Sequence, residues 1–371
     1  MASLGPRDTR DFTVFTGVDA TELAKLSLQD GTTAQAVVSL LEAGYGALNV
    51  ELNNDPLYSS LWSFTNDPQV SYRVGTNMTF GDRTEYARPD PQRAALEGHM
   101  LPLKGYDMAL GWTWDYLRDA YMGQIEADIA SSINAARDKV RAVTLTKLIT
   151  KTDATGSANG LGAAGISPGF ATTAASTGVD FLPPSYAGTA FATTHEHYAI
   201  GATTLTAAQF VTNMKNLREH GHKAPFTLLI SPTDSATVSA LTTFVAISDP
   251  RIAQYSSTTA IVNSATAPEN AIGYLTDSQA WVVPVDGWPA NYTFMFKSYG
   301  PNSPLNPLRV RVRRGETSLR VIAFPDPNKG TSPANPLGTL IGFTEFGVGV
   351  NDRIDGVPHY SNSSWADGTV S

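Results

Sequence analysis

The chain has 371 residues, a formal net charge of −8 at pH 7 and no cysteine, which excludes disulfides, thiolate nucleophiles, iron–sulfur clusters and cysteine-ligated zinc. The negative net charge argues against general adhesion to nucleic acid, and we expect no membrane helix because no apolar run approaches about 18 residues. Hydrophobic residues make up 42% of the chain, enough for a substantial core, whereas charged residues make up only 16%.

The first 60 or so residues are predicted to form an extended arm that carries one short helix. Apolar residues share one face over residues 33–43, and Gly44 is expected to end this helix. The flanking residues 12–18 and 47–52 are predicted to be irregular or strand-like. Such an arm has too little apolar surface to fold alone, so we expect it to lie on the rest of the chain or on a neighbouring copy.

Residues 68–108 are predicted to form a long two-stranded projection, because large residues recur there at every second position. The alternating residues are Tyr72, Val74, Met78 and Phe80 on one side and His99, Leu101 and Leu103 on the other. Between them, residues 81–83 and 88–91 are polar and turn-rich. An isolated hairpin is marginal in water, so we expect this one to lean on another subunit.

Residues 113–149 are predicted to form one long helix that scaffolds the chain. Apolar residues recur in steps of three and four, Thr113 is a suitable N-cap, and no proline occurs between Pro102 and Pro168. Acidic residues gather in its first half and basic residues in its second, which complements the helix dipole.

The next segment, residues 152–190, is rich in Ala, Thr, Gly and Ser and is predicted to be a loop or a loosely ordered insertion. Residues 205–300 then predict a compact α/β unit. Its helices cover residues 205–219, ended by Gly221, and 231–246; its strands cover residues 226–230, 271–275, 280–285 and 292–296. The tail is predicted to be mostly β, with strands over residues 308–313, 319–323 and 343–350, and turns from Arg353 onward.

Residues 160–165 (GLGAAG) match the dinucleotide-binding fingerprint letter for letter. That motif needs a strand before it and a helix after it. Here a predicted helix precedes the motif and a proline-containing segment follows it, so we interpret it as a flexible glycine loop. No P-loop motif occurs.

Two histidine pairs are candidate metal ligands. On a strand, His195 and His197 would face the same way and could share a metal ion. Further ligands could come from His220, His222 or Glu196, which would make the protein a metal-dependent, β-rich enzyme. The alternative is that these are hydrogen-bonded structural histidines, and the sequence favours that alternative because the motif is much weaker than a helical HExxH.

The densest basic patch is a row of arginines along the predicted strand at residues 308–313. Its members are Arg309, Arg311 and Arg313, with Arg314 and Arg320 nearby. They could contact a nucleic-acid backbone, but no interleaved aromatic residues support base stacking. We favour pairing with carboxylates across a subunit interface. Arg83 and Arg88, at the tip of the projection, are further interface candidates.

An arm, a two-stranded projection, a long helix, an α/β unit and a β-rich return form an order that resembles the major capsid proteins of tailed double-stranded DNA phages, which have the Hong Kong 97-like fold. Three segments are similar to family sequences: residues 111–117 (GWTWDYL), residues 346–353 (FGVGVNDR), and residues 182–186 followed by 194–198. The resemblance implies an α+β fold with an N-terminal arm (1–66), an E-loop hairpin (67–110), a P domain with the spine helix and a loop insertion (111–204), an A domain (205–304), and P-domain return strands with the C-terminus (305–371).

The resemblance also implies the function. It indicates a structural protein with no catalytic, cofactor-binding or metal-binding residues. Such proteins assemble in the host cytoplasm into hexamers and pentamers of an icosahedral virion shell that encloses double-stranded DNA without sequence-specific binding and without a membrane. An encapsulin-type compartment with a protein cargo is the alternative.

Two departures from family patterns bear on the partners. Some family members carry an N-terminal scaffolding segment, but here the spine begins near residue 113, so a scaffolding protein is expected to be separate, as are portal and cement proteins. Some members crosslink an E-loop lysine to an asparagine, but residues 67–103 contain no lysine. Locking by non-covalent contacts or by a cement protein is therefore expected.

Overall fold

The structure is a computed structural model. It describes residues 27–75, 78, 92–152, 154–158, 161–171, 183–187, 189–192, 194–201, 203–248, 267–325 and 339–370. Within this part of the chain, no helix is long and apolar enough to span a bilayer. The predicted segment 12–18 and the tip of the projection lie outside the described residues.

The chain divides into two units, each with its own internal packing. Unit 1 comprises Met1–Asn53, Gly105–Lys139 and Leu319–Glu345, and unit 2 comprises Asn54–Lys104, Val140–Ser318 and Phe346–Ser371. Helix α5 (Met122–Leu148) and strand β15 (Thr339–Val350) each contribute residues to both.

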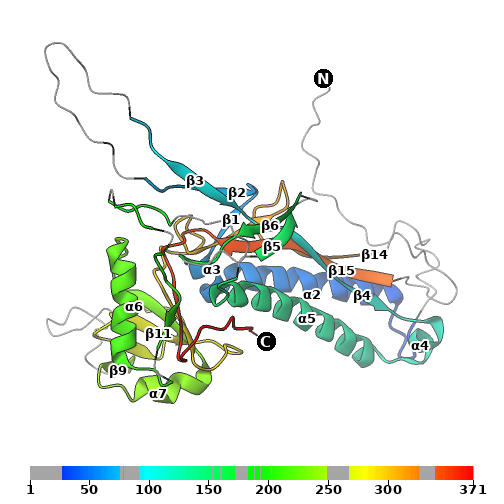
Figure 1. Ribbon diagram of the computed structural model, residues 1–371. Coiled ribbons are helices and arrows are strands. Elements are labelled where there is room, and N and C mark those ends of the chain that lie inside the picture. The colour runs from blue at the N-terminus through cyan, green and yellow to red at the C-terminus, as the bar shows by residue number, and fades with distance from the viewer. Residues whose placement is uncertain are drawn as a thin grey trace, which may run out of the picture. The chain divides into compact units, whose positions relative to one another are not determined.

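Two helices lie side by side in unit 1, α2 (Ala34–Asn54) and the first part of α5 (Figure 1). The Tyr45 hydroxyl donates to Ser132 Oγ at 3.2 Å between them. The prediction that Gly44 ends the first helix was wrong, as was the strand-like interpretation of residues 47–52, because α2 continues to Asn54. Gly44 serves for close packing instead: a Cβ there would lie 2.6 Å from Ile133 Cδ1.

The predicted long helix is interrupted. Thr113 is the N-cap, as expected, and its Oγ1 accepts from Tyr116 N. However, α4 (Trp114–Asp119) ends at Ala120, where the backbone is extended, and α5 begins only at Met122. The Ala120 carbonyl accepts from Gln29 N at 3.1 Å, and Met122 N donates to Asp30 Oδ2 at 2.9 Å. Contacts with residues 29–30 thus stabilise the interruption between α4 and α5. A helical repeat in the sequence could not predict these contacts.

Two asparagines of α2 bind the backbone at and just before strand β14 (Val321–Pro325) in unit 1. Strand β14 pairs antiparallel with the first part of β15, and β4 (Lys104–Gly111) also pairs with β15. Asn49 forms two hydrogen bonds with the Val321 main chain, at 2.9 and 2.7 Å, and Asn53 forms two with Leu319. Asn49 therefore satisfies the first residue of β14 in the way that a neighbouring strand would, and Asn53 does the same for Leu319, just before the strand.

Unit 2 contains the predicted projection. Strand β2 (Gln69–Arg73) pairs antiparallel with β3 (Leu96–Met100), which confirms the hairpin. After α3 (Pro56–Leu61), strand β1 (Trp62–Thr65) runs parallel to β13 (Leu308–Val312), and β13 pairs in turn with the second part of β15.

The Ala- and Gly-rich segment after α5 was predicted to be a loop or a loosely ordered insertion, and its first part is instead paired strand. It forms a hairpin of β5 (Ala154–Ala158) and β6 (Leu161–Ser167). Strand pairing satisfies its backbone, although its small residues give no strand-period signal.

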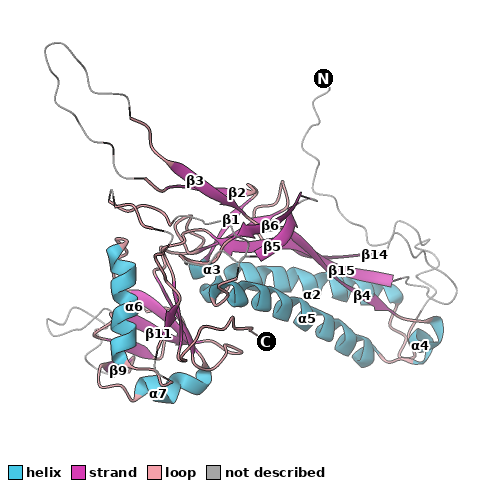
Figure 2. Cartoon of the chain, in the orientation of Figure 1, coloured by secondary structure: helices cyan, strands magenta, loops and turns pink. Residues whose placement is uncertain are grey.

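A seven-stranded sheet in unit 2 confirms the predicted α/β unit (Figure 2). Its strand order is β7 (Ala199–Ile200), β16 (Val357–Tyr360), β12 (Tyr292–Phe296), β8 (Phe226–Ile230), β11 (Ala280–Pro284), β10 (Gly273–Leu275) and β9 (Phe244–Ala246). Helix α6 (Ala207–Glu219) starts with a Thr206–Gln209 capping box and buries Phe210 and Leu217 against the sheet.

Two details of this unit differ from the predictions. The helix predicted to reach residue 246 stops early, as a 3-10 turn (Pro232–Asp234) and α7 (Ser235–Ser239), because residues 244–246 pair with β10. Strand β16 was missed and forms from residues that had been interpreted as turns.

We predict that Gly46→Ala raises the free energy of unfolding by about 0.5–1 kcal/mol, because alanine lowers the entropy cost of an exposed helical position. Gly46 is exposed and no atom lies within 4 Å of a Cβ there. The matched variant Gly44→Ala must displace Ile133 and should gain less or lose stability. Denaturant unfolding measures both, and an equal gain in both would contradict this packing of α2 on α5.

Candidate functional site

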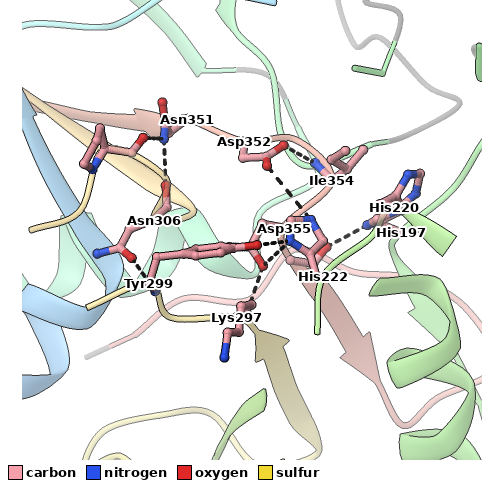
Figure 3. A network of polar contacts seen from close by, with 12 residues as sticks. His197, His220, His222, Lys297, Tyr299, Asn306, Asn351, Asp352, Ile354 and Asp355 are labelled. Atoms are coloured by element: carbon pink, nitrogen blue, oxygen red, sulfur yellow. Dashed lines mark hydrogen bonds and ion pairs between the residues drawn. The ribbon is translucent and has the colours of Figure 1, made fainter. Parts of the chain in front are cut away.

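The residues between β15 and β16 form a polar centre in unit 2 (Figure 3). Asn351 Nδ2 donates to the carbonyls of Pro304 and Asn306, at 2.7 and 2.8 Å. Asn306 Oδ1 accepts from Tyr299 N at 3.0 Å, and Asp352 Oδ1 accepts from Ile354 N at 3.1 Å. The side chains therefore fix the backbone of several loops at once.

Arg353 is a buried cation, with only 1% of the residue exposed. Its Nε donates to the Gly169 carbonyl at 3.2 Å, and its Nη1 lies 3.5 Å from the Tyr72 hydroxyl. Its own carbonyl accepts from Ala171 N at 2.8 Å. A buried charge is costly unless polar groups surround it, so Arg353 ties strand β2 and the turn at residues 168–171 to this segment.

Beside it, burial disfavours the charged forms of two titratable groups. Burial and the nearby Asp352 carboxylate raise the pKa of Asp355 well above its ordinary value, and burial lowers the pKa of His222 to about 4. His222 Nδ1 lies 2.7 Å from the Tyr299 hydroxyl and 3.8 Å from Asp355 Oδ1, which accepts from Lys297 N at 2.8 Å. Both pKa shifts disfavour the charged forms, so they oppose an ion pair between His222 and Asp355.

Three histidines converge on one point. The Nε2 atoms of His195, His197 and His220 are 2.7 to 3.0 Å from one another, and Glu219 Oε1 lies 3.4 Å from His195 Nε2 and 3.6 Å from His220 Nε2. His197 Nδ1 lies 2.9 Å from the Gly356 carbonyl. Burial lowers the pKa of His197 to about 3 and that of His220 to about 2.

The structure thus places the predicted pair, His195 and His197, beside one of the predicted further ligands, His220. The other two, His222 and Glu196, lie elsewhere. The Glu196 carboxylate points to Lys151 Nζ, at 2.9 Å, and His222 lies in the polar centre. Glu219 was not among the predicted ligands. Its position one residue before His220, at the end of a helix, was the only available signal.

The arginine row does not form one exposed face. Arg311 is 6% exposed, and its Nη1 donates to the Leu101 carbonyl at 3.0 Å. It therefore stabilises the interior of unit 2. Arg309 is half-buried, and its guanidinium is 3.4 Å from both Ser63 Oγ and the Pro304 carbonyl. Arg313 is exposed. An interface role for Arg309 and Arg313 stays a prediction, and Arg83 and Arg88 lie outside the described residues.

The glycine fingerprint is incorporated in β6, with residue 160 itself outside the described part. A strand, not a helix, follows its first glycine. The interpretation that the motif does not bind a dinucleotide agrees with this context, but the flexible loop that was expected there is a strand.

Gly221 directs the chain between His220 and His222. Its φ is +85°, and a Cβ there would overlap the Tyr186 ring. We predict that Gly221→Ala lowers the free energy of unfolding by roughly 2 kcal/mol or more, from backbone strain plus the overlap. The control Gly315→Ala has a φ of +97° but no atom within 4 Å, so it should lose only about 1 kcal/mol. Equal losses by thermal unfolding would show that Tyr186 does not constrain this turn.

His99 gives a prediction on pH. Its Nε2 lies 2.7 Å from the Val350 carbonyl, and burial lowers its pKa to about 3. The folded protein therefore binds fewer protons than the unfolded protein, and stability is lost as the pH falls from about 6.5 toward 3. Between pH 7 and 5 we expect the wild type to lose about 2 kcal/mol more than His99→Gln, measured by denaturant unfolding. Parallel pH profiles would contradict this.

Comparisons with known proteins were made for sequence and for structure. No family model matches the sequence, and no curated protein matches it. Among solved structures, a chain from Mycobacterium phage Patience matches with a TM-score of 0.64 and 20% identity, over 92% of this chain and 92% of that chain. The mature capsid of bacteriophage PhiM1 (TM-score 0.43, 12% identity, 82% and 86% covered) and the capsid of the native GTA particle (0.45, 13%, 82% and 89%) are more distant.

These last two likenesses are too weak to carry an argument. The first covers nearly all of both chains, and the hairpin, the interrupted spine helix and the seven-stranded sheet follow the order expected from the sequence. The chain has the α+β Hong Kong 97-like fold of tailed-phage capsid proteins.

Proposed function

We propose that this protein is a major capsid protein that assembles into the hexamers and pentamers of an icosahedral shell. The observation that carries the proposal is the likeness to a chain of Mycobacterium phage Patience over 92% of both chains. The shell would enclose packaged double-stranded DNA, and the protein would be located in the virion.

The hairpin of β2 and β3 supports self-assembly. Its base is anchored, because Val70 and His99 are 5% and 3% exposed. Farther out, Leu96 is 72% exposed and Met78 is 54% exposed. A two-stranded sheet is marginal in water on its own. Covering its exposed apolar side chains with a partner lowers the free energy. A neighbouring copy of the same chain is the partner that we propose.

The charge of the chain fits a container. A net charge of −8 gives weak attraction between the wall and DNA, which would let the genome slide during packaging. This part of the proposal fails if the inner surface of the assembled shell proves strongly basic.

The division into parts belongs to the same proposal. We assign residues 1–66 to an arm, 67–110 to the E-loop, 111–204 and 305–371 to the P domain, and 205–304 to the A domain. Scaffolding, portal and cement proteins would be separate chains. Arg309 and Arg313, with Arg83 and Arg88, are the proposed ion-pairing residues between subunits.

We predict that Leu96→Glu blocks assembly without unfolding the subunit, because the new charge would have to be buried against a neighbour. Negative-stain microscopy of purified wild-type protein should show particles of uniform size, and the variant should remain as small subunits. Since Leu96 is 72% exposed, the thermal midpoint of the free subunit should be unchanged.

Three outcomes would count against the proposal. Wild-type protein that stays monomeric at high concentration would contradict self-assembly, and normal particles from Leu96→Glu would exclude the hairpin as an interface. Particles that carry a protein cargo in place of DNA when isolated from their natural source would favour an encapsulin-type compartment.

A further inference from the structure

The contacts among the three histidines cannot all be hydrogen bonds. Each Nε2 has a single in-plane position, which holds either a proton or a lone pair. Three nitrogens that are mutually 2.7 to 3.0 Å apart would need a proton between each pair, whereas one N–H points toward one neighbour. Because each of the three nitrogens has only these two states, at least one contact brings two lone pairs or two N–H groups together. A cation between three lone pairs removes that repulsion.

We propose that His195, His197, His220 and Glu219 bind a divalent transition-metal ion, and that zinc is the ion that fits these donors best. The candidate ligand atoms all lie within 4.8 Å of one another. Three imidazole nitrogens and a carboxylate oxygen are typical zinc donors in a four-coordinate site. This inference does not depend on the proposed function.

The distances fit such an ion. A point equidistant from the three nitrogens in their own plane is about 1.7 Å from each, and the usual zinc–nitrogen distance is about 2.0–2.1 Å. The ion would thus lie about 1.2 Å outside the plane of the nitrogens, where it needs a fourth ligand. Ligands of a tetrahedral ion are about 3.3 Å apart, and Glu219 Oε1 is 3.4 and 3.6 Å from two of the nitrogens.

Surrounding groups orient the ligands. The Gly356 carbonyl, 2.9 Å from His197 Nδ1, accepts the Nδ1 proton, so the lone pair of His197 is on Nε2, facing the other two histidines. Such an outer hydrogen bond is typical of metal-bound histidine. The Phe191 ring packs on both His195 and His220, at centroid distances of 4.9 and 4.3 Å, and restricts their rotation.

The site has a route to solvent and a structural role. The Glu219 side chain is 47% exposed, and His220 lines a cavity of about 480 Å³, so an ion can enter after folding. The four ligands would complete the coordination, which favours a structural site over a catalytic one with an open position. The ion would join residues 195–197, which precede β7, to the end of α6.

The test is metal binding by the full-length protein. After removal of metal with a chelator, titration with Co²⁺ should give the visible absorption of four-coordinate cobalt at one ion per chain. Zn²⁺ should displace the cobalt and raise the thermal midpoint, because an ion that binds only the folded state stabilises it. His195→Ala and Glu219→Gln are suitable variants, because both side chains are partly exposed and are expected to tolerate substitution.

His195→Ala should weaken binding by about 100-fold or more, since loss of a mere outer-shell partner already costs about 10–100-fold. Glu219→Gln should also weaken binding. The matched control is Glu196→Gln, which lies between two ligands but whose carboxylate contacts Lys151; it should bind metal as the wild type does. Absence of both the cobalt absorption and the zinc-dependent stabilisation would overturn the proposal. So would equal binding by His195→Ala, which would indicate adventitious surface sites.

Discussion

The burial of the Arg353 guanidinium is the interaction on which much of unit 2 depends. A cation that is 1% exposed must find polar partners inside the protein. The Gly169 carbonyl and the Tyr72 hydroxyl lie within 3.5 Å of it, so the base of the hairpin and the turn at residues 168–171 are held to the segment that carries Arg353. In the same turn, the Ala171 carbonyl accepts a hydrogen bond from His197 N at 2.8 Å.

Other residues of the FGVGVNDR segment, residues 346–353, also hold distant parts of the chain against this segment. At Gly347 a Cβ would overlap the Pro102 main chain, and at Gly349 it would meet the Leu101 side chain. These glycines let the connection between β3 and β4 lie directly on β15. Asn351 then fixes the loop before β13. A segment that resembled family sequences is thus also a place where several distant parts of the chain meet.

The sequence predicted what depends on local periodicity. The β2–β3 hairpin, the Thr113 N-cap, α6 and its Gly221 stop, and most strands of the seven-stranded sheet were visible in alternation and in capping residues. The errors arose where tertiary contacts override local preference. Gly44 is a packing contact rather than a stop, residues 29–30 interrupt the spine helix, and β16 exists because β12 offers it a partner.

The histidine cluster shows the same limit. The spacing of His195 and His197 indicated a shared direction, but nothing local brings them to His220 and Glu219, which come from the end of α6. Burial of Arg311 was equally invisible, because a strand with alternating arginine and valine has the pattern of a half-exposed strand, whereas β13 lies between β1 and β15.

We propose that the β2–β3 hairpin is incomplete without a neighbouring subunit. Its base is anchored and its outer residues are exposed, so any loss of solvent exposure on assembly should be confined to the outer part of these two strands. Amide hydrogen exchange, measured on free subunits and on assembled particles, tests this most directly. We expect rapid exchange of the outer β2–β3 amides in the free subunit and strong protection after assembly. Strong protection already present in a stable monomer, unchanged by assembly, would contradict it.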